Sequence, residues 1–215
     1  KSTRAGSADE TVEFTAVANT KYYLVIDGFN NAVSSFNLTA GSISKYVQIN
    51  EVGGYSATAD FVEIINRSAC SAPLSGLVVE HLGTCDQSIV QSASFATAAA
   101  LPPGQVARAT EGTRRAGIDV PYNSCDLIYG GATHTLLCSG SCDRTSCSNV
   151  LDYMTSDNDT TDTKLPGGPT CATFSPNPVN VLNMVTGQSI NRTAFTGAPT
   201  TWRTTDWILA PETGN

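Results

Sequence analysis

Long apolar stretches and helical periodicity are both missing from this sequence of 215 residues. No apolar run reaches the roughly 18 residues that a membrane-spanning helix needs, so we expect no membrane insertion. No window repeats its apolar residues every 3.6 positions over a useful length. The best helical stretch, residues 95–101, is short and ends at Pro102 and Pro103, where a helix cannot easily continue. The sequence therefore argues against a helical or membrane-embedded protein.

Charged side chains are scarce, and positive ones are scarcer than negative ones. Asp, Glu, Lys and Arg make up 14% of the chain, and 12 Lys and Arg against 19 Asp and Glu give a net charge of −7. An acidic surface repels phosphate backbones and anionic lipid headgroups, so binding to nucleic acid or to a membrane surface is disfavoured. The like charge is instead typical of a soluble secreted surface.

Motifs of common catalytic sites are absent as well. There is no G-x-S-x-G nucleophile elbow, no H-E-x-x-H zinc motif and no glycine-rich phosphate loop. The two histidines, His81 and His134, each lie in a strand-like run, without a nearby arrangement of Asp with Ser or Cys. A catalytic triad assembles in space rather than in sequence, but together these absences predict a protein that is not an enzyme.

The sequence has instead a succession of short strand patterns. In residues 46–68, Val47 and Ile49 alternate with polar residues, as do Val62 and Ile64 around Glu63. This period of two, with glycines and small residues between the runs, predicts a β-hairpin. Further strand patterns lie at 12–17, 22–26, 35–39, 73–79, 126–129, 133–138 and 149–154. We therefore expect an all-β protein.

The cysteines point to an oxidising compartment. In a Ser- and Thr-rich acidic chain they indicate disulfides, and their odd number leaves one unpaired within this chain. Cys70 and Cys85 flank the strand pattern near residues 74–82 and are candidates for a staple. His134, Cys138, Cys142 and Cys147 also suggest a zinc site, but the spacing is unusual for zinc, so local disulfides are favoured. The seven disulfide candidates are Cys70, Cys85, Cys125, Cys138, Cys142, Cys147 and Cys171.

Residues 12–39 resemble part of a known bacterial domain. The segments F-T-A-V-A-N-T-K-Y-Y-L-V-I-D-G-F-N and S-F-N-L-T are similar to the C-terminal half of a bacterial pre-peptidase C-terminal domain. The resemblance implies that residues 1–40 are the truncated C-terminal part of a small β-sandwich or meander, followed by a linker at 41–45. Its strands are then expected to present an open edge or an exposed apolar face.

The rest of the chain resembles a second family. The segments I-N-E-V and D-F-V-E-I-I-N near the start, and Q-S-I-N-R and T-D-W-I-L-A-P-E-T-G-N near the end, are similar to a lamin-tail domain. The resemblance implies that residues 46–215 form an immunoglobulin-like β-sandwich with a buried Trp207. Such a sandwich typically has about 100 residues, so the excess predicts disulfide-bearing loop insertions.

Two further groups of residues are candidate sites. The acidic turn with Asp157, Asp159 and Asp162 offers closely spaced oxygens that calcium could use, although it lacks the glycine and glutamate of an EF-hand loop; a solvated acidic turn is the simpler interpretation. Trp202 is the candidate for a surface aromatic that stacks on carbohydrate. The acidic residues Glu51, Asp60 and Glu63 are interpreted as structural rather than catalytic.

We expect a non-enzymatic extracellular interaction or adhesion module of a larger secreted or cell-surface bacterial protein. Its expected partner is a protein or a cell-surface polymer, and it needs no cofactor unless calcium binds. Two alternatives stay open: the accessory C-terminal region of a secreted peptidase or nuclease whose catalytic domain lies upstream, and a calcium- or carbohydrate-binding module. Fold alone does not decide between them.

Overall fold

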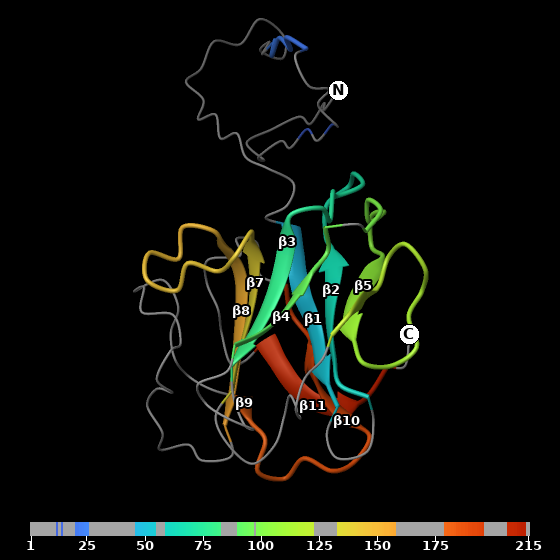
Figure 1. The fold of residues 1–215 in the computed structure, drawn as a ribbon, viewed down its shortest axis with the longest axis vertical. Helices are drawn as coiled ribbons and strands as arrows, with labels where there is room; N and C mark the ends of the chain where they lie inside the picture. The colour runs from blue at the N-terminus through green and yellow to red at the C-terminus, as the bar shows by residue number, and fades with distance from the viewer. Residues whose placement is uncertain are drawn as a thin grey trace, which may run out of the picture.

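The computed structural model describes residues 12, 14, 20–25, 46–54, 59–82, 90–96, 98–122, 133–157, 179–195 and 206–213. Within these residues the protein is built from β-strands and turns and has no α-helix. Accordingly, the described part contains no helix that is long and apolar enough to cross a membrane. The expected all-β fold is confirmed (Figure 1).

Two sheets form the sandwich. The first sheet has the strand order β11-β10-β1-β2-β5-β6, and the second has the order β4-β3-β7-β8-β9. All pairs of neighbouring strands are antiparallel except β5 with β6 and β8 with β9. The first sheet contains β1 (Val47–Gly53), β2 (Phe61–Asn66), β5 (Val106–Thr110), β6 (Val120–Pro121), β10 (Gln188–Arg192) and β11 (Trp207–Pro211). The second contains β3 (Leu77–Leu82), β4 (Val90–Ser94), β7 (Thr133–Ser139), β8 (Val150–Asp157) and β9 (Val179–Asn180).

The predicted hairpin of residues 46–68 forms the centre of the first sheet. β1 and β2 pair in antiparallel register, with Ile49 opposite Ile64 and Val52 opposite Val62. The register shifts between Ile49 and Glu51, which makes Asn50 the extra residue of a β-bulge. The bulge keeps Val52 on the apolar face, although it follows Ile49 by three positions rather than two.

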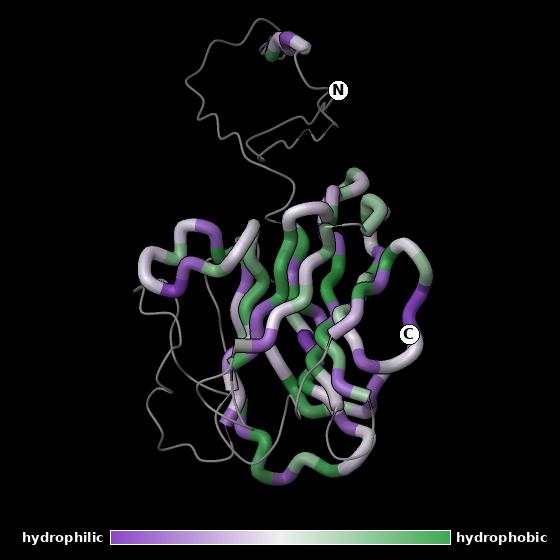
Figure 2. The backbone as a smooth tube through the Cα atoms, viewed as in Figure 1, coloured by the Kyte–Doolittle hydropathy of each residue, from purple (hydrophilic) through white to green (hydrophobic). Residues whose placement is uncertain are grey.

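The core lies between the sheets and is closed by apolar side chains from both. Strand residues alternate between faces, so the inward-facing residues of each sheet meet in the centre. The fully buried large side chains are Ile49, Ile64, Leu74, Leu77, Phe95, Leu101, Leu136, Leu137, Met154 and Ile190. Figure 2 shows hydrophobic segments along both sheets and more hydrophilic ones in several connecting loops. Trp207 is buried, as its resemblance to the lamin-tail ending implied.

A buried ion pair joins the two sheets at one side. Asp152 of β8 accepts hydrogen bonds from Arg192 Nη1 of β10 at 2.5 Å and from the backbone N–H of Ile49 at 2.7 Å. Arg192 Nη1 also donates to the Ile49 carbonyl oxygen at 2.9 Å. β10 pairs with β1 only at Glu51 and Val52. The side chains of Asp152 and Arg192 therefore satisfy the backbone N–H and carbonyl oxygen of Ile49, where β10 provides no paired residue.

Several strand predictions are confirmed, and some elements were not foreseen. The patterns at 133–138 and 149–154 correspond to β7 and β8, and the pattern at 73–79 corresponds to the start of β3. Residues 126–129 lie outside the described residues. The short parallel strands β6 and β9 have no pattern of their own, because two residues are too few to show a period. Phe95 is buried in the core rather than part of a helix.

The strand predicted at 22–26 is wrong over its described part. Residues 20–25 have no strand assignment, and Tyr23 and Val25 are 82% and 85% exposed. Phe14 and Tyr22 do contact each other, with ring centroids 4.9 Å apart. The strands predicted at 12–17 and 35–39 lie largely outside the described residues, so the expected open edge or exposed apolar face stays a prediction.

Candidate interaction loop

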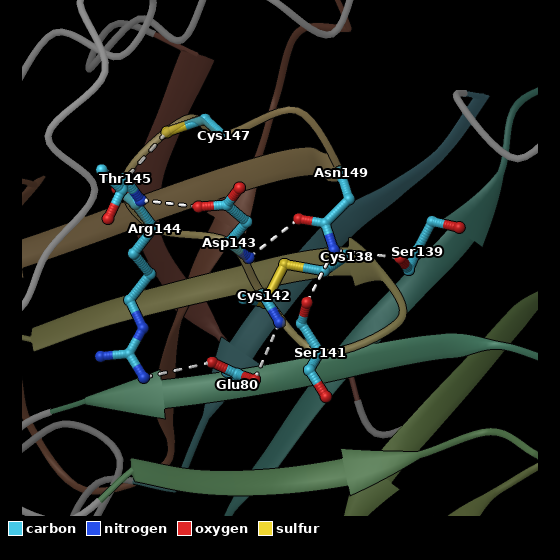
Figure 3. Close-up of a disulfide and its surroundings, with 10 residues drawn as sticks. All are labelled: Glu80, Cys138, Ser139, Ser141, Cys142, Asp143, Arg144, Thr145, Cys147 and Asn149. Carbon is cyan, nitrogen blue, oxygen red and sulfur yellow. Dashed lines mark hydrogen bonds and ion pairs between the residues drawn. A yellow bond between two sulfur atoms is a disulfide. The ribbon is translucent and has the colours of Figure 1, made fainter.

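The connection between β7 and β8 is the most elaborate loop that the structure describes. We call residues 139–149 the disulfide loop (Figure 3). It leaves β7 through Gly140, whose positive φ of 83° favours glycine. The Gly140 N–H donates to the carbonyl oxygen of Gly76 at 2.7 Å. The loop is thereby attached at its root to the turn that precedes β3.

A disulfide and a carboxylate fix the first half of the loop. Cys138, at the buried end of β7, is bonded to Cys142, and their Cα atoms are 5.4 Å apart. Glu80 on the neighbouring strand β3 accepts a hydrogen bond from the Cys142 N–H at 3.0 Å. Glu80 also lies 3.5 Å from Arg144 Nη2. The expectation of a disulfide in the cysteine cluster is confirmed, and the loop is joined to the second sheet by two residues.

Asp143 organises the tip of the loop. Its Oδ1 accepts hydrogen bonds from the backbone N–H groups of Thr145 and Ser146, both at 3.0 Å. Its Oδ2 accepts a hydrogen bond from the Ser146 hydroxyl, and its carbonyl oxygen accepts one from the Cys147 N–H. The hydroxyl and N–H of Ser146, with the Thr145 N–H, lower the pKa of the Asp143 carboxyl. Asp143 thus builds an Asx turn, which fixes the backbone at the most exposed part of the loop.

Asn149 closes the loop from the other end. Its Nδ2 donates to the carbonyl oxygens of Ser139 and Ser141, at 3.1 and 2.6 Å. Its Oδ1 accepts a hydrogen bond from the Asp143 N–H at 2.9 Å. One amide side chain therefore connects the two ends of the loop with its tip, as the dashed lines in Figure 3 show.

Cys147 supplies another covalent attachment. It is disulfide-bonded and has a φ of 54°, a conformation that is uncommon for residues other than glycine. Its partner lies outside the described residues. The segment from β7 to β8 is therefore held by two disulfides: the Cys138–Cys142 bond near β7 and the bond of Cys147 near β8.

The surface of the disulfide loop is made mainly of hydroxyl-bearing side chains. Ser141, Thr145, Ser146 and Ser148 are exposed, and Ser146 already bonds to Asp143 and Ser148. These groups can donate and accept hydrogen bonds to a partner.

Among the other predicted disulfide cysteines, one is unpaired and three lie outside the described residues. Cys70 is a free thiol, so the suggested staple between Cys70 and Cys85 is wrong. Its carbonyl oxygen, not its sulfur, holds the chain there by accepting hydrogen bonds from Asn66 Nδ2 and the Ser68 hydroxyl. Cys85, Cys125 and Cys171 lie outside the described residues.

The metal candidates do not converge in the described part of the structure. Asp157 is a buried residue at the end of β8 rather than a member of an exposed acidic turn, while Asp159 and Asp162 lie outside the described residues. No group of three His, Cys, Asp or Glu side chains that could hold a metal occurs among the described residues. The zinc alternative loses two ligands, because Cys138 and Cys142 are bonded to each other.

The acidic residues of the β1–β2 hairpin are buried and engaged in structural hydrogen bonds. Glu51 and Glu63 face each other in register on the outer face of the first sheet. Glu51 accepts hydrogen bonds from the Ser189 hydroxyl at 2.5 Å and from both the N–H and the hydroxyl of Thr213. Glu63 accepts from Asn50 Nδ2 and Arg108 Nε, yet burial raises the pKa of its carboxyl. Asp60 is also buried, at the residue before β2.

The two histidines lie on opposite faces of the second sheet. His81 Nδ1 is 2.9 Å from the Thr135 hydroxyl, and His134 Nδ1 is 2.5 Å from the Tyr153 hydroxyl. The Nε2 atoms of both are buried without a hydrogen-bond partner. Burial, with a smaller contribution from the other histidine, lowers the pKa of His81 to about 3. Burial, with a smaller contribution from Arg144, lowers the pKa of His134 to about 4. Both rings are therefore neutral at pH 7.

Sequence reasoning missed most of the residues that shape the disulfide loop. The Asp143-x-Thr145-Ser146 run is a recognisable turn signal and could have been found. Asn149 and Glu80 carry no comparable signal, because their partners become neighbours only in the folded sheet. Trp202, the candidate surface aromatic, lies outside the described residues.

Comparison with models of known protein families found no match, and a search of the curated proteins found no similar sequence.

Proposed function

We propose that this chain is a non-enzymatic extracellular interaction module of a larger secreted or cell-surface bacterial protein. In this proposal the sandwich is a lamin-tail-like domain, preceded by part of a pre-peptidase C-terminal-like domain, and the disulfide loop is the surface that contacts the partner. The partner is a protein or a cell-surface polymer with hydrogen-bonding groups.

The observation that carries the proposal is the internal bracing of the disulfide loop. Asp143 and Asn149 use their side chains on the loop backbone, and disulfides fix Cys142 and Cys147. A loop that is ordered before binding loses less conformational entropy when a partner binds. Disulfides also persist mainly in oxidising compartments, which supports an extracellular location.

The buried polar groups support a role that is not enzymatic. Glu51, Glu63 and Asp152 each accept hydrogen bonds from neighbouring strands or the chain end. Carboxylates used in this way maintain the fold. A catalytic carboxylate would instead need access to a substrate.

Binding of the fluorescently labelled chain to intact bacterial cells tests the proposal. Thr145→Arg places a bulky charge on the exposed tip of the disulfide loop, and Thr113→Arg places the same change on another exposed loop. We expect saturable binding that Thr145→Arg weakens at least about tenfold and Thr113→Arg leaves unchanged. Protease treatment of the cells then separates a protein partner from a polymer.

Equal binding by both variants would remove the disulfide loop from the interface. Turnover of peptide, nucleic acid or ester substrates by the purified chain would contradict the non-enzymatic assignment. Melting curves for both variants establish that neither change unfolds the sandwich.

A further inference from the structure

The connection between β9 and β10 leaves large apolar side chains in solvent. We call residues 181–187 the apolar turn, which is the orange loop at the lower end of the sandwich in Figure 1. Leu182 and Val185 in this turn are 65% and 58% exposed, whereas Val181 and Met184 are buried and attach the turn to the core. Exposed apolar side chains that stand together mark interaction sites more often than singly scattered ones do. The apolar turn is therefore a candidate contact surface.

The apolar turn is held in place by its own hydrogen bonds. Asn180 Oδ1 accepts a hydrogen bond from the Leu182 N–H, and Gln188 Oε1 accepts one from the Val185 N–H, both at 2.9 Å. The Gln188 N–H donates in return to the Val185 carbonyl oxygen at 3.0 Å. The backbone N–H groups of both exposed residues are thus satisfied locally, so their side chains are what a partner would meet. A surface that is ordered before binding loses less conformational entropy on association.

Charge is absent from the apolar turn and from the sequence around it. Residues 165–191 contain no Asp, Glu, Lys, Arg or His, and this is the longest such stretch in the chain. Two acidic residues bond to the turn through their backbone: Asp157, which is buried, and Glu212, which is half-buried. The chain as a whole has a net charge of −7, so copies of it repel one another. The apolar turn is a neutral surface that two copies can bring together at low electrostatic cost.

We propose that two copies of this chain associate through the apolar turn. In a two-fold arrangement one surface serves both partners, so Leu182 and Val185 of one copy pack against the same pair of the other and leave water. A lipid surface is the less suitable occupant, because apolar side chains that enter an anionic membrane are typically accompanied by basic ones, which the turn lacks. Two side chains from each copy make a small contact, so the association is weak and reversible. It goes beyond the proposed function, since the disulfide loop takes no part in it.

Sedimentation equilibrium of the full chain, from micromolar to millimolar concentration, measures the association. All samples carry Cys70→Ser, which prevents covalent dimers through the free thiol. We expect a monomer at low concentration and a dimer at high concentration. Sodium chloride should strengthen the dimer, because it screens the repulsion between two chains of net charge −7. A monomer at every concentration, or a dimer that weakens as salt rises, would overturn the proposal.

Leu182→Asn is the deciding variant, and Leu24→Asn is its matched control. Leu24 is the same residue type with nearly the same exposure, 62%, but lies in the N-terminal part of the chain. Because a two-fold contact loses each side chain twice, Leu182→Asn should weaken the dimer at least about tenfold. Leu182→Asp, which also brings like charges together, should abolish the dimer, and Leu24→Asn should leave it unchanged.

Equal effects of the two Asn variants, or a stronger effect of Leu24→Asn, would contradict a contact through the apolar turn. Val185→Asn repeats the test with the second exposed side chain and should weaken the dimer as Leu182→Asn does. Melting curves establish that every variant is folded, which we expect because the changed side chains are exposed.

Discussion

The first sheet buries carboxylates, and the second sheet buries imidazoles. Glu51 and Glu63 each accept two or more hydrogen bonds from neighbouring groups of the first sheet and the chain end. His81 and His134 each make a bond through Nδ1 and leave Nε2 without a partner. Burial disfavours the charged form of a side chain, so it raises the pKa of Glu63 and lowers the pKa values of His81 and His134. These groups of the two sheets are therefore expected to respond to acid with opposite sign.

The largest expected effect comes from cutting the connection between the sheets. Asp152→Ala leaves Arg192 buried without its ion pair and removes the acceptor of the Ile49 N–H. Breaking a buried ion pair from one side typically costs about 3–5 kcal/mol, which urea unfolding measures. The matched control is Arg115→Ala, which removes the exposed partner of Asp119 and leaves the Asp119 carboxylate its hydrogen bonds from the Arg108 and Arg115 N–H groups; surface pairs contribute about 0–1 kcal/mol. Similar losses in both variants would show that the pair does not hold the sheets together.

The next largest effect is expected from lowering the pH, which acts on the two buried histidines of the second sheet. In the folded protein the pKa values of His81 and His134 lie near 3 and 4, below an unfolded value of about 6.5. The unfolded chain therefore binds these protons first, and the free energy of unfolding should fall by a few kcal/mol between about pH 6.5 and pH 4.

Unfolding in urea at several pH values measures this slope. His134→Gln should reduce it, and His81→Gln should reduce it further, since the histidine with the lower pKa contributes more. A slope that both variants leave unchanged would assign the acid sensitivity to other groups.

The disulfide of the second sheet should contribute less. Cys138 and Cys142 are only four positions apart, and closing so short a loop constrains the unfolded chain by about 2 kcal/mol in the entropic description. Cys142→Ser should lower the free energy of unfolding by about that amount and speed proteolysis within the loop. Cys70→Ser, which changes the free thiol, is the control and should leave both quantities nearly unchanged.

The smallest expected effect is that of acid on Glu63 in the first sheet, and its sign is opposite to that of the histidines in the second sheet. Burial raises the folded pKa of Glu63, so this group is a cost to stability at pH 7 that disappears as pH falls through its folded pKa. The wild-type chain should therefore gain stability relative to Glu63→Gln on acidification. The difference between the two unfolding free energies, followed from pH 7 to pH 4, checks the sign. A difference that shrinks or reverses would contradict the role of burial.

The sequence was sufficient for features that repeat locally and insufficient for those that depend on distant partners. The alternation in β1 and β2 predicted the hairpin, because a half-buried strand must place every second residue inside. The cluster at Cys138 and Cys142 predicted a disulfide, because closely spaced cysteines in an oxidised chain pair locally. The pairing of Asp152 with Arg192 crosses 40 residues and joins two sheets, so neither residue carries a local signal of it.

The same distinction explains the errors. Residues 22–26 have high strand propensity, but propensity describes how well a side chain fits a sheet, and residues 20–25 have no strand assignment. Cys70 and Cys85 flank a strand pattern in the sequence, yet Cys70 is a free thiol, and its carbonyl oxygen rather than its sulfur contacts Asn66 at the end of β2. The pKa of His134 depends on burial that no motif encodes.

The way in which Asp152 and Arg192 satisfy Ile49 also bears on self-association. An unpaired stretch of strand backbone is a template on which another chain can add a strand. The carboxylate accepts from the Ile49 N–H and the guanidinium donates to its carbonyl oxygen, so the two side chains occupy the groups that an incoming strand would use. Loss of either side chain would leave one of these two backbone groups without its partner.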